Sequence, residues 1–218
     1  MKINILLSII FISILCTCTK ENTLLNPHMN EFLVPLNTGN LWEYQVGDDN
    51  ITIESIDSLY VNNGINIYIL NSDRGRWSAS QAVYNTSDGY FIDNRQFVNE
   101  NNHEYVFKYP CTTGMRWTNK FEFFGTHVTK NYELLSTNEK IELSSGIFHC
   151  FVYKVYSKDT QYVINEDHYQ GYDKYYFDPQ IGLVLIKRTL TDDNFNPIDE
   201  FEEITSRVLI DFSVQSKE

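Results

Sequence analysis

The sequence predicts an all-β fold, a curved antiparallel meander that forms a partial barrel or two packed layers. Apolar and polar residues alternate in short runs, as at 65–69, which is the period of a strand with one buried face. The runs are rich in β-branched and aromatic residues, and the chain holds 15 Tyr, 14 Phe and 3 Trp. Gly, Pro, Asn or Asp stand between the runs, as turns require. We expect roughly ten to a dozen strands.

The expected strands follow one another at short intervals. Trp42, Tyr44 and Val46 share one face of the first strand, and a second begins at 51–53. The turn Asn-Asn-Gly at 62–64 precedes a third strand at 65–69. The other strands are expected at 77–84, 90–92, 105–109, 115–124, 128–135, 147–156, 161–164, 172–177 and 183–190, with the last within 201–212. Helix should be minor outside the N-terminal segment.

The N-terminus predicts export and a lipid anchor. Residues 3–15 are almost entirely apolar, about 13 residues, too short for a bilayer span but suited to the core of a signal peptide. Leu-Cys-Thr-Cys at 15–18 resembles the lipobox of bacterial lipoproteins, which implies that Cys18 becomes the lipidated N-terminus. The alternative is an ordinary secretory cleavage near this point without a lipid.

This interpretation divides the chain into three parts. We expect a signal peptide at 1–17, the lipidated cysteine and a flexible tether at 18–34, and a single β-domain at 35–218. Several acyl chains on one cysteine would hold the protein stably on the membrane. The expected location is the outer membrane of the cell envelope, on its periplasmic or its surface-exposed side.

The charge of the chain excludes one class of partner. Lys and Arg number 17 against 29 Asp and Glu, which gives a formal net charge of −12. Nucleic acids and anionic membrane surfaces are bound by clustered cations, so we expect neither to be a partner of the domain itself. The scattered acidic residues are typical of a solvated surface.

A short motif occurs twice. Pro-x-x-Thr-Gly-x-x-Trp stands at 35–42 and again at 110–117, although the chain has only 5 Pro and 3 Trp. After each copy of the motif, glycines that precede later expected strands recur in the same order. The pattern predicts two related β-units, about 35–95 and 110–190, within one sheet system. The alternative is two independent uses of a glycine turn before a tryptophan.

Three motifs resemble a diffuse group of bacterial envelope lipoproteins of unassigned function. They are Pro-Leu-x-x-Gly-x-x-Trp-x-Tyr at 35–44, Gly-x-Phe-x-Cys at 146–150, and Tyr-Tyr followed by Gly-Leu-Val within 175–184. Asp-Pro-Gln at 178–180 replaces the small residues usual before the last glycine. The resemblance implies an exported β-domain and no known reaction.

Few residues suggest site chemistry. Residues 192–203 have the oxygen-ligand spacing of a calcium loop, but proline occupies the position that needs glycine, so we expect neither metal nor cofactor. The His and acidic residues at 103–104 and 166–168 lack the spacing of a metal site and are expected at the surface. Arg74, Arg76 and Trp77 form a compact group that could contact a ligand, or else Trp77 belongs to the core.

Cysteine usage leaves one pair in the predicted domain. Cys111 and Cys150 could form a disulfide in an oxidising envelope, or they could be two separate buried thiols.

The expected function is a non-catalytic lipoprotein whose domain binds an apolar, lipid-like, peptide or protein partner. The alternatives are a glycan-binding surface lipoprotein and a hydrolase without a local sequence signature.

Overall fold

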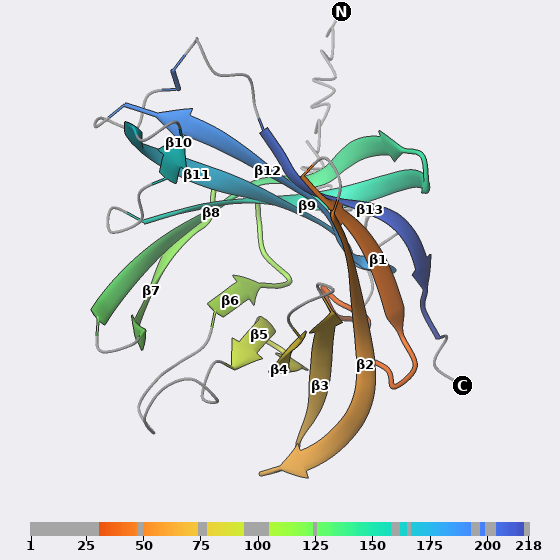
Figure 1. The fold of residues 1–218 in the computed structure, drawn as a ribbon. Coiled ribbons are helices and arrows are strands. Elements are labelled where there is room, and N and C mark those ends of the chain that lie inside the picture. Colours follow the sequence, from red (N-terminus) through yellow and green to blue (C-terminus); the bar gives the residue numbers. More distant parts are fainter. Residues whose placement is uncertain are drawn as a thin grey trace, which may run out of the picture.

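The computed structural model describes most of the predicted domain, and Figure 1 shows it as a ribbon. The described residues are 31–47, 50–73, 78–93, 105–123, 126–157, 162–164, 167–192, 197–198 and 204–215. The strands are β1 (Leu41–Val46), β2 (Asn50–Asn62), β3 (Ile65–Asp73), β4 (Ser78–Thr86), β5 (Gly89–Asp93), β6 (Tyr105–Lys108), β7 (Arg116–Phe123), β8 (Thr126–Leu143), β9 (Gly146–Tyr156), β10 (Tyr162–Ile164), β11 (Asp167–Asp178), β12 (Gly182–Thr191) and β13 (Ile204–Ser213). No helix within the described ranges is long and apolar enough to cross a bilayer.

Twelve strands form one antiparallel meander that is nearly closed into a barrel, which confirms the predicted fold class. The order is β6-β5-β4-β3-β2-β1-β13-β12-β11-β9-β8-β7, and β10 pairs with β11 outside this path. Strands β6 and β7 are the two ends of the sheet. The indole of Trp117 on β7 donates to the carbonyl of Val106 on β6 at 3.1 Å, so the two ends approach each other.

Aromatic side chains fill the inside of the barrel. Phe107 on β6 packs against the rings of Tyr132, Tyr153, Tyr175 and Phe177, with centroid distances of 5.7, 5.3, 5.2 and 4.8 Å. These partners come from β8, β9 and β11, across the barrel from β6. Alternation in each strand sends every second residue inward, so this part of the core follows from the sequence period.

Strands β2 and β8 are much longer than the sequence pattern predicts. Their pairing contains bulges, at 56–58 in β2 and at 134–139 in β8. A bulge adds a residue to one strand and reverses the inward and outward positions beyond it. The alternation therefore breaks within each strand, which is why the pattern indicates only their regular parts.

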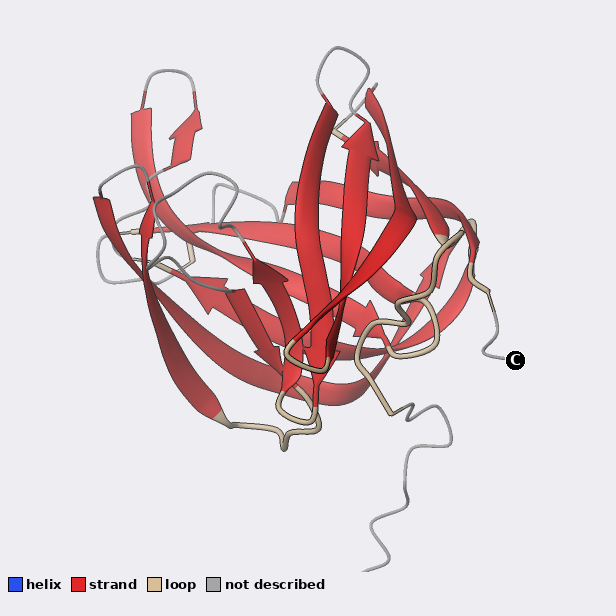
Figure 2. Cartoon of the chain, turned by 90° about the horizontal axis from the view of Figure 1, so that it is seen from below, coloured by secondary structure: helices blue, strands red, loops and turns tan. Residues whose placement is uncertain are grey.

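One end of the barrel is closed by the residues that precede β1. Because neighbouring strands are antiparallel, the β2–β3, β4–β5 and β11–β12 turns lie at this same end. Residues 31–37, here called the plug segment, cross it, and Figure 2 shows the tan chain before β1 folded against the strand ends. Leu33, Val34 and Leu36 are buried, and Asn40 Nδ2 donates to the carbonyl of Pro35 at 2.8 Å. Packing against the barrel thus begins before residue 35, earlier than the predicted domain boundary.

The two copies of the repeated motif form the same local structure. Gly39 and Gly114 have φ angles of 90° and 85°. Gly39 N donates to the carbonyl of Ile56 at 2.8 Å, and Gly114 N donates to that of Leu134 at 2.7 Å. Each motif leads into the first of two paired strands, β1 with β2 and β7 with β8. The sequence repeat is therefore also a repeat of backbone conformation.

Candidate functional site

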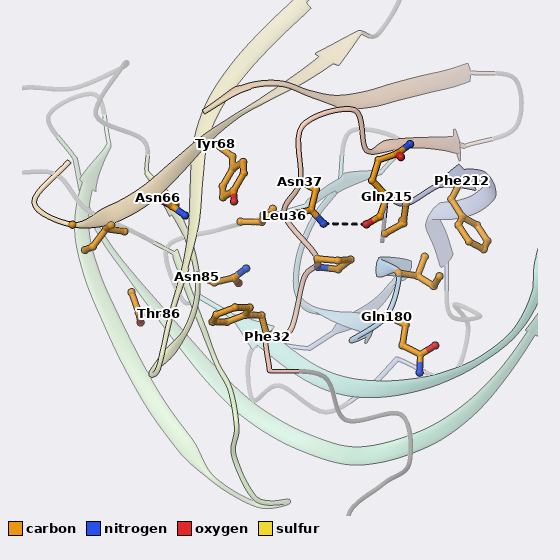
Figure 3. A pocket seen from close by; sticks show the side chains of 15 residues that line it. Phe32, Leu36, Asn37, Asn66, Tyr68, Asn85, Thr86, Gln180, Phe212 and Gln215 are labelled. Carbon is orange, nitrogen blue, oxygen red and sulfur yellow. Dashed lines mark hydrogen bonds between the residues drawn. The ribbon is translucent and has the colours of Figure 1, made fainter. Parts of the chain in front are cut away.

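A pocket of about 680 Å³ lies at the end of the barrel that the plug segment closes, and we call it the barrel-end pocket (Figure 3). Its walls come from the plug segment, from the β2–β3, β4–β5 and β11–β12 turns, and from the chain after β13. They consist of Phe32, Pro35, Leu36, Asn37, Gly64, Ile65, Asn66, Tyr68, Asn85, Thr86, Gln180, Ile181, Phe212, Val214 and Gln215. The volume falls within the usual range for sites that bind small ligands.

The lining of the barrel-end pocket is uncharged, although 21% of the chain is Asp, Glu, Lys or Arg. Its described residues combine apolar side chains with five carboxamides and one threonine. Figure 3 shows Tyr68 and Asn85 on one side of the pocket and Phe212 and Gln180 on the other. Such a surface offers neutral hydrogen-bonding groups beside apolar area, so it matches an uncharged ligand.

Hydrogen bonds to the backbone hold two of these carboxamides. Asn37 Nδ2 donates to the carbonyl of Gln215 at 3.0 Å, which joins the plug segment to the chain after β13 (Figure 3). Asn85 Nδ2 donates to the carbonyl of Val34 at 2.8 Å. Among the described residues, the buried Oδ1 of Asn85 has no hydrogen-bond partner. Its free acceptor is a polar feature next to the pocket that a ligand or a water can satisfy.

A second cavity, of about 240 Å³, lies inside the barrel on the other side of the plug segment. We call it the interior cavity. Val34 and Leu36 form its floor, and aromatic residues of the core form much of its wall. Leu36 lines both cavities, so the plug segment separates them.

The interior cavity contains a buried ion pair. Arg207 Nη1 on β13 donates to Glu54 Oε1 on β2 at 2.7 Å, and the two side chains are 13% and 11% exposed. The guanidinium also lies 4.9 Å from the ring centre of Tyr44, a cation–π contact. Ser72 lines the same cavity, and its buried Oγ has no partner within the described part of the chain.

Burial sets the protonation of these groups. Burial alone lowers the pKa of Arg207, but the Glu54 carboxylate more than offsets this and holds the pKa above its ordinary value. Burial, and then the negative charge of Glu54, raise the pKa of both Tyr44 and Tyr90. The cavity therefore presents one guanidinium paired with one carboxylate beside neutral phenols.

The interior ion pair was not among the residues that the sequence singled out. One signal was present, because Glu54 alternates with Thr52 and Ile56, and all three are buried in the structure. A carboxylate on an apolar face predicts a buried partner. Nothing in the sequence indicates that the partner is Arg207, which lies 153 residues away.

The structure leaves the two cysteines unbridged, so the disulfide considered from sequence is not formed there. The thiol of Cys111 donates to the carbonyl of Lys108 at 2.9 Å and lies 3.7 Å from the Tyr153 hydroxyl. Cys150 is fully buried three residues before Tyr153 on β9. Residues three apart in a regular strand point to opposite faces, so Cys150 is directed away from Cys111.

Other predicted site residues lie outside the described residues. These are the lipidation site Cys18, the candidate ligand contacts Arg74, Arg76 and Trp77, and most of the calcium-like loop at 192–203. Within the residues that the structure does describe, no three His, Cys, Asp or Glu side chains gather into a group that could hold a metal ion.

The class of protein is defined here by fold alone, a nearly closed antiparallel β-meander with a plugged end. No family model matches the chain, and no curated protein matches it. It is similar to the crystal structure of a "putative exported protein with YmcC-like fold" from Bacteroides fragilis, at 14% identity and a TM-score of 0.54, over 84% of this chain and 100% of that one. It is also similar to a "putative lipoprotein" from Parabacteroides distasonis, at 14% identity and a TM-score of 0.52, over 85% of this chain and 100% of that one. At this identity the likeness establishes the shared fold.

Proposed function

We propose that the protein is a lipid-anchored envelope protein, held by acyl chains on Cys18, that binds an uncharged, largely apolar ligand in the barrel-end pocket without catalysis. The observation that carries the proposal is the pocket of about 680 Å³ with no charge among its described lining residues. A chain with a net charge of −12 that keeps one concave surface neutral is suited to a neutral ligand. The exported and lipoprotein descriptions of the two similar structures support the anchor.

A lipid-like ligand fits the apolar part of the lining. Phe32, Leu36, Ile65, Phe212 and Val214 supply aliphatic and aromatic surface that would be removed from water by an acyl or prenyl chain. The carboxamides could hold a neutral head group by hydrogen bonds. The location is also suitable, because the pocket borders Phe32, close along the chain to the predicted anchor.

A glycan ligand is the second candidate, and the carboxamides favour it. Asn37, Asn66, Asn85, Gln180 and Gln215 are five neutral side chains that can each both donate and accept hydrogen bonds. Tyr68 and the phenylalanines offer ring faces for stacking on a sugar. The two candidates differ in whether ligand affinity depends on the carboxamides or on the apolar wall.

The anchor is tested by replacing Cys18 with Ser and following acyl label and membrane fractionation, with Cys16→Ser as the matched control. Loss of label and of membrane association in the Cys18 variant alone is the expected result. Unchanged membrane association together with unchanged label would contradict the anchor.

The ligand site is tested by native mass spectrometry of protein extracted in mild detergent and by titration with monoolein and with neutral oligosaccharides. Thr86→Asp puts a carboxylate into the neutral lining, whereas Ser87→Asp places one on the next, exposed residue of the same turn. We expect Thr86→Asp to lose at least about tenfold in affinity for whichever probe binds, because an uncharged ligand that covers the carboxylate would remove its charge from water. Equal affinities of the two variants would refute the site.

A further inference from the structure

The tip of the β2–β3 hairpin exposes apolar side chains to solvent. Val61 is 64% exposed, and Leu59 and Tyr60 are 46% and 45% exposed. Ile65, on the other strand of the hairpin, is 37% exposed. Residues 58–72 contain no charged side chain, in a chain in which 21% of residues are charged. We call residues 59–65 the hairpin tip. A neutral tip with exposed aliphatic and aromatic side chains indicates a surface that is covered in use.

The hairpin tip lies beside the place where the predicted tether joins the domain. Gly64 and Ile65 line the barrel-end pocket together with Phe32, so the tip and the start of the plug segment border the same pocket. About 13 residues separate Cys18 from the first described residue, Glu31. A chain of this length spans at most about 45 Å when fully extended, so Cys18 lies within that distance of the start of the plug segment.

The chemistry of the tip fits the interfacial region of a bilayer. Tyrosine is enriched where lipid head groups meet acyl chains, because its ring is apolar and its hydroxyl is polar. Leu59, Val61 and Ile65 add aliphatic surface that favours the acyl side. The overall charge of −12 opposes electrostatic attraction to anionic lipids, so contact would depend on apolar surface.

We propose that the hairpin tip contacts the bilayer that carries the anchor, and that the barrel-end pocket therefore faces the membrane. This inference rests on the lipid anchor of the proposed function. The exposed apolar residues of the hairpin tip would then be covered by the lipid surface that lies within reach of Cys18. This contact also supplies a route by which a lipid-like ligand would pass from the bilayer into the pocket.

The test uses the full lipidated protein in phosphatidylethanolamine vesicles doped with dibrominated phosphatidylcholine, a quencher of tryptophan fluorescence. Tyr60→Trp reports on the tip. Ile53→Trp is the matched control, because Ile53 is 41% exposed on the same strand and about 20 Å further along it. After subtraction of the wild-type signal, we expect at least about twofold greater quenching for Tyr60→Trp. Adding Val61→Asp to it should bring quenching down to the control level.

Each outcome bears on the inference. Equal quenching at the two positions in acylated protein would overturn the membrane contact while leaving the anchor intact. Equal quenching with concentration-dependent sedimentation would show that a second copy covers the tip instead. Protein that carries no acyl chain on Cys18 by mass spectrometry would overturn the anchor and this inference together. If Tyr60→Trp does not melt cooperatively, Leu59→Trp replaces it.

Discussion

Removing one partner of the interior ion pair should destabilise the domain strongly. In Arg207→Met the carboxylate of Glu54 stays about nine-tenths buried but loses the donor that lies 2.7 Å away. The cation–π contact with Tyr44 is lost as well. An unpaired buried charge typically costs about 3 to 5 kcal/mol, which is a large share of the roughly 5 to 15 kcal/mol that stabilises most domains. Equilibrium unfolding in urea measures this as a lower midpoint at an unchanged slope.

Two comparisons make the prediction specific to burial. Arg116 forms a pair with Glu133 at 2.8 Å, but its side chain is 74% exposed, so Arg116→Met should leave the urea midpoint unchanged within error. The double variant Glu54→Leu with Arg207→Met removes both charges and should be more stable than Arg207→Met alone. A loss below about 1 kcal/mol in Arg207→Met, or a double variant as unstable as the sum of its single changes, would refute the reasoning.

Three further predictions concern the backbone, a half-buried lysine and the thiols. Gly89 has a φ of 144°, and a Cβ there would lie 2.2 Å from a backbone oxygen of β6. Gly89→Ala should therefore lower the thermal midpoint far more than Gly47→Ala, because a Cβ at residue 47 would enter open space. Equal shifts of the midpoint would contradict this prediction. Burial lowers the pKa of Lys130 to about 8, against about 10.4 when unfolded, so the unfolded state binds more protons between these values and stability should rise from pH 8 to 10.5. Lys130→Met should remove this rise and add about 3 kcal/mol at pH 7. A flat wild-type profile over that interval would count against the prediction. Without reductant, two thiols per lipidated chain should react with Ellman's reagent in denaturant. In the native state Cys111 should react first, because Cys111 is half-buried whereas Cys150 is fully buried. A thiol-free chain would indicate a disulfide.

The sequence by itself determined the strands and therefore the fold class. Alternation at 42–46 and 65–69 marks strands, because a strand places successive side chains on opposite faces. The turn residues at 62–64 mark a hairpin, because a tight turn needs residues that accept special backbone angles. The repeated Pro-x-x-Thr-Gly-x-x-Trp motif likewise forms one backbone conformation twice. These features are local, so a single stretch of chain contains all the information needed to predict them.

Only the tertiary structure decided where the cavities lie and what lines them. The barrel-end pocket brings together Phe32, Tyr68, Asn85, Gln180 and Phe212, which come from five separate parts of the chain. The partner of Glu54 and the orientation of Cys150 away from Cys111 also depend on strand order and register. A periodic pattern states which face of a strand is buried, but it does not state which strands become neighbours. The pairing of β1 with β13 joins segments far apart in the chain, and local sequence does not encode such a long-range contact.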